Sequence, residues 1–275
     1  MAHPEPSRLL KERAATMADS LQALPGGLPA SGAPLPAALQ LLAMAGDGRR
    51  ALMLRHAERR PIRTMDDAWQ APLTDRGRAD AHALGRRLSS AGVTALSLAS
   101  SPVSRCVETA RCIDAGWRAG SSGEAGTAGE AGEAGEAAAD VAVMPDFGSP
   151  FILDNPRALG GMLALGNAAF LRAWFDGGWG GAMVPADEAA ESQLDALTRR
   201  IEARGPQDLA ASILHIVISH DWNIALLREK VLSQRHEAIG LPNFLDGLVV
   251  FRRGGRLVVG AGSALRWLEP SRRGP

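Results

Sequence analysis

The sequence is poor in the residues that mark secreted, disulfide-rich or membrane-bound proteins. It contains only two cysteines, Cys106 and Cys112, and their spacing is neither a CxxC pair nor part of a histidine-rich zinc set. A disulfide framework is therefore not expected, and a reducing compartment fits this composition. No apolar run reaches the roughly 18 residues of a membrane span. The first residues, MAHPEPSR, lack the basic and apolar pattern of a signal peptide, so we expect a cytoplasmic protein with no membrane partner.

An excess of charge of one sign is also missing. The 30 Lys and Arg residues balance the 30 Asp and Glu residues, which argues against a nucleic-acid partner held by a general basic field. Lysine itself is nearly absent, because only Lys11 and Lys230 occur. The cations are therefore almost all arginines, whose planar guanidinium suits phosphate. Outside a motif, this arginine content can simply reflect genome composition.

Short apolar runs alternate with helical patterns along most of the chain. The patterns predict strands at 51–54, 93–99, 141–144 and 214–218, a closing hairpin at 248–259, and helices at 74–90, from 101, 167–175, 187–204 and 221–232. Strands that alternate with helices favour an α/β fold. We therefore predict a three-layer α/β/α sandwich with a mostly parallel central sheet.

Composition divides the chain into a main domain and several added segments. Residues 1–48 are rich in Ala, Pro and Gly and are interpreted as an N-terminal extension to a domain at 49–275. Residues 119–138 carry a Gly-Glu-Ala repeat, which predicts a flexible loop. Residues 147–186 have no clean period and hold Trp174 and Trp179. We hypothesise that this insertion caps a substrate pocket, with these tryptophans affecting KM more than stability.

Three expected strand ends carry residues suited to an anion. Arg55 and His56 follow the first strand, Arg105 lies in the first turn of the helix after the second, and His220 and Asp221 follow the strand at 214–218. In open α/β sheets, ligands bind beyond the carboxyl ends of the strands, where helix N-termini also favour negative charge. The three segments can therefore converge on one anionic ligand.

These segments resemble the histidine phosphatase superfamily. Residues 55–61 (RHAERRP) resemble its Arg-His-Gly-x-Arg-x-Pro signature, with Ala57 in place of the usual glycine. Residues 73–77 (LTDRG), 101–110 (SPVSRCVETA) and 219–221 (SHD) are similar to its later motifs and follow in the same order. The resemblance covers about two thirds of the chain and implies a phosphoglycerate mutase-like fold. Its features are mixed between the acid phosphatase branch and the mutase branch.

The resemblance implies a role for each matching residue. His56 is expected to accept the phosphoryl group as a phosphohistidine, while Arg55, Arg59 and Arg105 bind the phosphoryl oxygens. His220 is expected to be a further donor, and Asp221 the general acid and then base. The reserve candidates for the acid are Glu58 and Glu108, because the mutase branch takes its acid from a glutamate elsewhere. No metal or cofactor is expected, and the partner is a small phosphorylated substrate.

Two alternatives to a phosphomonoesterase remain open. A phosphomutase is disfavoured because the chain has no tyrosine, so the mutase pattern that includes tyrosine is missing. A non-catalytic phosphate-binding or interaction protein of the same fold is the other alternative, and Ala57 together with the large insertion allows it. The residues do not indicate the substrate or the oligomeric state.

Overall fold

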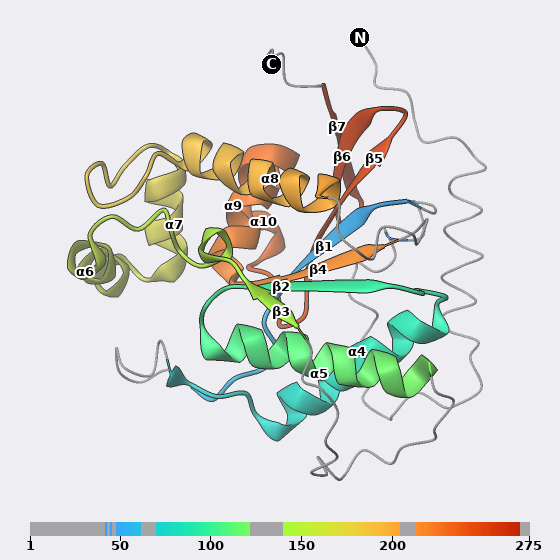
Figure 1. Cartoon of the computed structure of the whole chain (residues 1–275). Helices are drawn as coiled ribbons and strands as arrows, with labels where there is room; N and C mark the ends of the chain where they lie inside the picture. The colour runs from blue at the N-terminus through green and yellow to red at the C-terminus, as the bar shows by residue number, and fades with distance from the viewer. Residues whose placement is uncertain are drawn as a thin grey trace.

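The computed structural model describes residues 48–61, 70–121, 140–203 and 213–269, together with Leu42 and Ala45. Most of the expected N-terminal extension lies outside these described residues. Leu42 packs into the core of the main domain. Within this part of the chain, one central sheet organises the molecule (Figure 1).

The central sheet has seven strands in the order β3-β2-β4-β1-β5-β6-β7. The bounds are β1 Arg50–Arg55, β2 Leu96–Ser100, β3 Val141–Val143, β4 Leu214–Ser219, β5 Gly247–Arg253, β6 Arg256–Ala261 and β7 Ala264–Leu268. The β3-β2-β4-β1 half is parallel. The other half pairs antiparallel, so β6 again runs with β1, while β5 and β7 run against it. Five strands therefore share one direction, as expected for a mostly parallel sheet.

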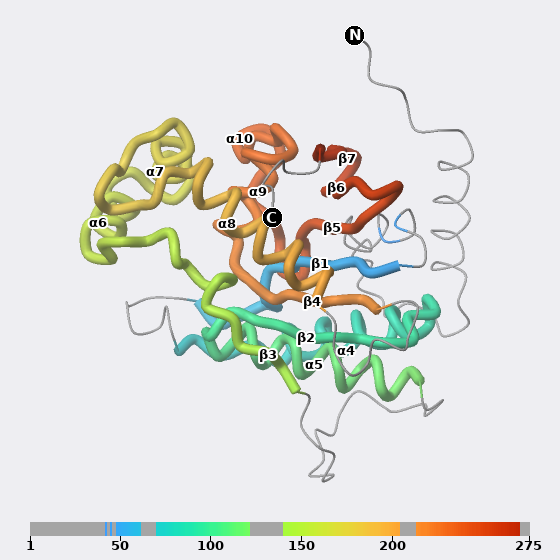
Figure 2. Tube along the Cα trace, turned by 45° about the horizontal axis from the view of Figure 1, so that its top comes forward, coloured from blue at the N-terminus to red at the C-terminus, as the bar shows by residue number. Residues whose placement is uncertain are grey.

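Helices cover both faces of the sheet. The bounds are α4 Asp75–Ser90, α5 Ser104–Ser121, α6 Asn155–Leu165, α7 Asn167–Phe175, α8 Ala186–Glu202, α9 Asp221–Leu232 and α10 His236–Ile239, with a 3-10 turn at Pro145–Phe147. Helices α4 and α5 lie on one face, and α8 and α9 lie on the other (Figures 1 and 2). The predicted three-layer α/β/α sandwich is confirmed.

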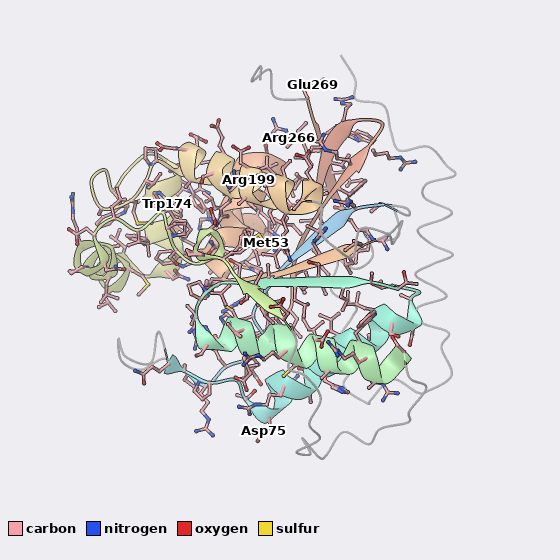
Figure 3. The ribbon with its side chains drawn as sticks, in the orientation of Figure 1. Met53, Asp75, Trp174, Arg199, Arg266 and Glu269 are labelled. Carbon is pink, nitrogen blue, oxygen red and sulfur yellow. The ribbon has the colours of Figure 1, made fainter. Side chains whose placement is uncertain are left out.

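Strand β1 shows why the sheet is buried on both faces. Its alternate residues Ala51 and Met53 belong to the core under α8 and α9, whereas Leu52 and Leu54 belong to the core above α4 and α5. Successive side chains of a strand point to opposite faces, so a continuous apolar run suits a central strand. Figure 3 shows Met53 near the centre of the molecule, between the two helical layers.

Glycines allow α4 and α5 to pack closely. A Cβ on Gly85 would lie 2.0 Å from the Ile113 carbonyl oxygen, and one on Gly116 would lie 1.9 Å from the His82 carbonyl oxygen. No side chain larger than hydrogen fits at either contact. Helix α4 begins as predicted, because the Thr74 hydroxyl accepts a hydrogen bond from the Gly77 amide at 2.9 Å.

Two boundaries on either side of α5 differ from the prediction. The helix begins at Ser104 rather than at Ser101, whose hydroxyl bonds to His220 as well as to the Val103 amide. It ends at Ser121, so the first three residues of the loop predicted at 119–138 are helical. Helix packing against α4 extends the element beyond its last strong apolar position. The rest of that loop lies outside the described residues.

The insertion at 147–186 contains one helix that the sequence pattern did not predict, α6, in addition to the predicted α7. Both lie on the side of the molecule where β2 and β4 end (Figure 1). Trp174 is fully buried, packs on Phe151 and Phe175, and donates to the Val184 carbonyl at 2.8 Å. Figure 3 places it inside this helical layer. Trp174 is therefore a core residue of the insertion, which corrects its expected role in substrate selection.

The closing hairpin of β5 and β6 is confirmed. Gly254 and Gly255 form its two-residue turn with φ values of 56° and 77°, the backbone that such turns require. Strand β7 extends the sheet by a third antiparallel strand.

Among the described helices, none alone has the length and apolar character to cross a membrane; α6 and α7 pass that test only as a pair, and they are bent by 119°.

Candidate active site

Three chain segments meet where β1, β2 and β4 end. The His56 amide donates to the Ser219 carbonyl at 3.0 Å, and the Ser101 amide donates to the Ile218 carbonyl at 2.8 Å. These bonds continue the parallel ladders by one residue beyond each strand. They place the segments carrying His56, Arg105 and His220 side by side.

His56 is held in one tautomer by the backbone. Its Nδ1 lies 2.8 Å from the Ala57 carbonyl oxygen, and because a carbonyl only accepts, Nδ1 carries the hydrogen. The lone pair is then on Nε2. The side chain is buried, and desolvation together with the nearby Arg105, His220 and Arg55 lowers its pKa to about 2. His56 is therefore neutral, as a nitrogen nucleophile must be.

Ala57 fits the position that is usually glycine. Its amide donates to the Thr109 hydroxyl at 3.0 Å, and that hydroxyl donates to the Arg105 carbonyl at 2.7 Å. The Ala57 methyl is fully buried in the core between the sheet and α4–α5. The substitution therefore keeps the carbonyl that orients His56, and Thr109 ties this loop to the helix that carries Arg105.

His220 faces His56 across the site. The two ring centroids are 5.7 Å apart, with planes at 70°. The His220 Nε2 lies 2.9 Å from the Ser101 hydroxyl oxygen, and Nδ1 lies 3.5 Å from an Arg105 nitrogen. Since a guanidinium only donates, Nδ1 is an acceptor and Nε2 carries the hydrogen. Burial, reinforced by the arginines, lowers the pKa of His220 to about 3, so the ring is neutral.

The three predicted arginines act on the same small region. Arg105 is buried in the first turn of α5, and its pKa is lowered by desolvation and by the charges of Arg59 and Arg55. The pKa of Arg59 is lowered by desolvation and by Arg55. The Arg55 guanidinium donates to the Pro242 carbonyl at 2.8 Å. Like charges this close oppose one another, so the cluster favours an anion between them.

Asp221 is the carboxylate that pairs with this cluster of arginines. One oxygen lies 3.0 Å from an Arg55 nitrogen, and the other accepts from the Trp222 amide at 3.0 Å. The second contact satisfies one backbone amide in the first turn of α9, whose N-cap residue is His220. Its side chain is 25% exposed, so water reaches this carboxylate.

The reserve acids Glu58 and Glu108 are engaged at α4. A Glu58 oxygen accepts from the Thr74 hydroxyl at 2.7 Å, next to the start of that helix. A Glu108 oxygen lies 2.7 Å from Arg78 Nε. Asp221, in contrast, pairs with Arg55 and acts to raise the pKa of Arg59 and of Arg105. Asp221 is therefore better placed than either glutamate to serve as the acid.

Sequence reasoning missed two groups at the site. Ser101, expected only as a helix cap, holds the His220 ring. Phe244 lies in the loop before β5, and its ring centroid is 5.7 Å from that of His56. Local sequence carried no signal for Phe244, because its position follows from the pairing of β5 with β1.

Within the described ranges, the side chains spaced like metal ligands are Glu229, His236 and Glu237, on α9 and α10. Arg172 already forms hydrogen bonds with both glutamates, at 2.8 Å and 2.5 Å. Glu229 lies in the last turn of α9, whereas His220 and Asp221 lie at the start of that helix, so the cluster is separate from the site. The residues around His56 instead form a cluster with an excess of positive charge.

The fold and this site define an α/β protein in which a neutral, buried histidine lies among arginines. Residues 51–122, roughly a quarter of the chain, match the model of the histidine phosphatase superfamily (branch 1). The resemblance read from the motifs is thereby confirmed over the segment that carries His56 and Arg105. It supports an activity of the phosphatase or mutase type. No curated protein matches the chain significantly.

Several solved structures are similar to the chain at low identity. They include YhfR of Bacillus stearothermophilus, with 16% identity, a TM-score of 0.48, and coverage of 78% of this chain and 96% of that one. A mycobacterial glucosyl-3-phosphoglycerate phosphatase has 16% identity, a TM-score of 0.45, and coverage of 80% and 96%. A putative α-ribazole-5′-phosphate phosphatase of Escherichia coli has 18% identity, a TM-score of 0.44, and coverage of 83% and 100%.

Proposed function

We propose that the protein is a phosphomonoesterase that forms a phosphohistidine on His56. The observation that carries the proposal is the charge around the His56 ring. The formal charges of the three guanidinium groups and the Asp221 carboxylate sum to +2, and both histidines are neutral. A phosphomonoester dianion would neutralise this pocket, and phosphoryl transfer depends mainly on such positioning and charge stabilisation.

The first half of the reaction uses the orientation of His56. Nε2 attacks phosphorus, and the bond from phosphorus to the leaving oxygen breaks. Asp221, a carboxylate while it pairs with Arg55, takes up a proton from solvent and gives this proton to that oxygen. Arg55 can exchange Asp221 for a phosphoryl oxygen when substrate binds, which releases Asp221 for this role. The Ala57 carbonyl stabilises the positive ring that forms, because it accepts from Nδ1 throughout.

The second half transfers the phosphoryl group to water. Asp221, now a carboxylate, takes a proton from water while the water oxygen attacks phosphorus and the bond to Nε2 breaks. The partial exposure of Asp221 supports hydrolysis over mutase activity, because a mutase must keep water from this step. His220 donates through Nε2 to the Ser101 hydroxyl, and this bond holds the ring in place in both halves.

Trapping the intermediate tests the proposal. Wild-type protein mixed with 4-nitrophenyl phosphate and quenched in base should carry an acid-labile, base-stable phosphoryl group, and His56→Ala should carry none. His82→Gln, at a half-buried histidine on α4, is the matched control and should keep the burst. Normal turnover by His56→Ala would overturn the proposal. An isomerised phosphate ester without free phosphate would indicate a mutase, and phosphate binding without any burst would indicate a non-catalytic protein.

A further inference from the structure

The loop between α10 and β5, residues 240–246, brings an aromatic ring to the nucleophile. The guanidinium carbon of Arg55 lies 4.4 Å from the Phe244 ring centroid, and the His56 and Phe244 ring centroids are 5.7 Å apart with planes tilted by 41°. The Phe244 side chain is nevertheless 36% exposed. One part of the ring therefore contacts the pocket, while another part is open to an arriving ligand.

The loop that carries Phe244 is fixed to the end of β1. The Leu245 amide donates to the Arg55 carbonyl at 3.1 Å, and the Arg55 amide donates to the Asp246 carbonyl at 2.9 Å. Leu245 has a φ of 58°, a left-handed backbone that is costly for leucine and that burial of its side chain helps to maintain. Gly247 follows, where a Cβ would lie 1.8 Å from the Met53 carbonyl oxygen. The position of the ring is therefore set by the fold.

Arg55 links this ring to the acid of the proposed reaction. Its guanidinium touches Phe244 on one side and Asp221, at 3.0 Å, on another. The leaving oxygen must lie next to Asp221, so the carbon skeleton attached to it emerges beside the Phe244 ring. A polyol would leave this exposed ring hydrated, whereas a planar apolar group would pack on it, either stacked or edge to face.

We propose that Phe244 lines a leaving-group subsite that selects phosphomonoesters of planar, apolar alcohols, such as aryl phosphates. This inference rests on the proposed function. A simpler role for the ring, in which it only positions the Arg55 guanidinium, would affect every phosphate ligand equally. The two roles therefore differ in whether Phe244 distinguishes ligands by the group attached to phosphorus.

Two phosphonates that have no cleavable P–O ester bond can distinguish these two roles. Their binding does not depend on the reactivity of a leaving group. Each phosphonate is measured as a competitive inhibitor of 4-nitrophenyl phosphate hydrolysis. In wild-type protein the inhibition constant of benzylphosphonate should be about tenfold lower than that of ethylphosphonate. Phe244→Ala should lose this preference, and Phe244→Leu should keep part of it. The inhibition constant of inorganic phosphate, which has no leaving group, should stay within about twofold in both variants.

Trp267→Ala is the matched control, because Trp267 is 42% exposed on β7 and packs on Arg256 at 5.6 Å in a similar pair. It should leave all three constants unchanged. Equal binding of the two phosphonates by an active wild-type enzyme would overturn the inference and leave the phosphatase proposal intact. If Phe244→Ala lost phosphate binding and benzylphosphonate binding to the same extent, the ring would only position Arg55. That result would also overturn the inference. Absence of any phosphomonoester hydrolysis or phosphonate binding by wild type would instead remove the proposed function.

Discussion

At the scale of single residues, two histidines are kept neutral by their surroundings. Burial is the largest cause for both, and the arginines add to it. The pKa of His56 falls to about 2 and that of His220 to about 3, from an ordinary value of 6.5. The arginines that we propose to bind phosphate thus also help to keep His56, the proposed nucleophile, unprotonated in mildly acidic solution.

This state predicts how stability depends on pH. Below about pH 6.5 the unfolded chain takes up protons at these histidines that the folded rings do not, so stability is lost as pH falls toward about 3. Each ring contributes a slope of up to about 1.4 kcal/mol per pH unit. Urea unfolding between pH 4.5 and 8 would give the slope of the unfolding free energy against pH. In the acidic part of this range, His220→Gln should take up about one proton fewer on unfolding than wild type, so its slope should be lower. An unchanged slope would mean that His220 is protonated in the folded protein.

Asp221 gives a second prediction at this scale. Asp221→Asn should lower kcat by about 10²- to 10⁴-fold for an alkyl phosphate and by less for 4-nitrophenyl phosphate, whose leaving oxygen needs less protonation. Steady-state kinetics with both substrates would measure the difference. Asp176→Asn, at a carboxylate that is 64% exposed and pairs with Arg172, is the control and should change neither rate. An equal loss for both substrates would indicate that Asp221 only positions Arg55.

At the scale of elements, the site depends on how closely α5 packs on α4. Gly85→Ala would push its methyl against the Ile113 backbone and force the helices apart. We expect a lower melting temperature and weaker phosphate binding, because α5 carries Arg105. Calorimetry and phosphate titration would test this. Gly160→Ala, in α6 with nothing within 4 Å of the added methyl, should be neutral or stabilising by about 1 kcal/mol. Equal behaviour of the two variants would contradict the packing argument.

The insertion gives another prediction for an element. Trp174 is fully buried among aromatic rings, so Trp174→Ala should lower the free energy of unfolding by about 3–5 kcal/mol. Urea unfolding would measure this loss, and Trp267→Ala, at an exposed position, should cost less than about 1 kcal/mol. A stable Trp174 variant with altered KM values would return Trp174 to the substrate pocket. The insertion as a cap stays a prediction, supported by the 2.7 Å bond from Trp222 to Asn167 beside Asp221.

At the scale of the whole molecule, a chain of zero formal net charge concentrates positive charge in one place. An anion that binds there should stabilise the entire fold. Phosphate at about 100 times its dissociation constant should add about 2.7 kcal/mol, which is a rise of roughly 5–10 °C in melting temperature. Chloride at equal ionic strength should have little effect. Arg105→Ala should lose the phosphate effect, while Arg111→Ala, exposed on the same helix, should retain it. A rise that is equal in both variants would place the anion elsewhere.

Much of this molecule is determined locally. The apolar runs of β1 and β4, the Thr74 cap and the Gly254-Gly255 turn each depend on residues close in the chain, so their elements could be predicted. The positions of His56, Arg105 and His220 at or just after strand ends also predicted that these side chains would converge. Element ends were less predictable, as at Ser104 and Ser121, because packing between helices decides them.

The sequence by itself determined the layered fold and the set of residues that gather beyond the ends of β1, β2 and β4. Only the tertiary structure decided the tautomer and charge of the two histidines, the burial of Trp174 and the placement of Phe244 over Arg55. The physical reason is that burial, electrostatic environment and contacts between distant segments arise from pairing such as that of β5 with β1. Local sequence patterns carry no record of such pairing.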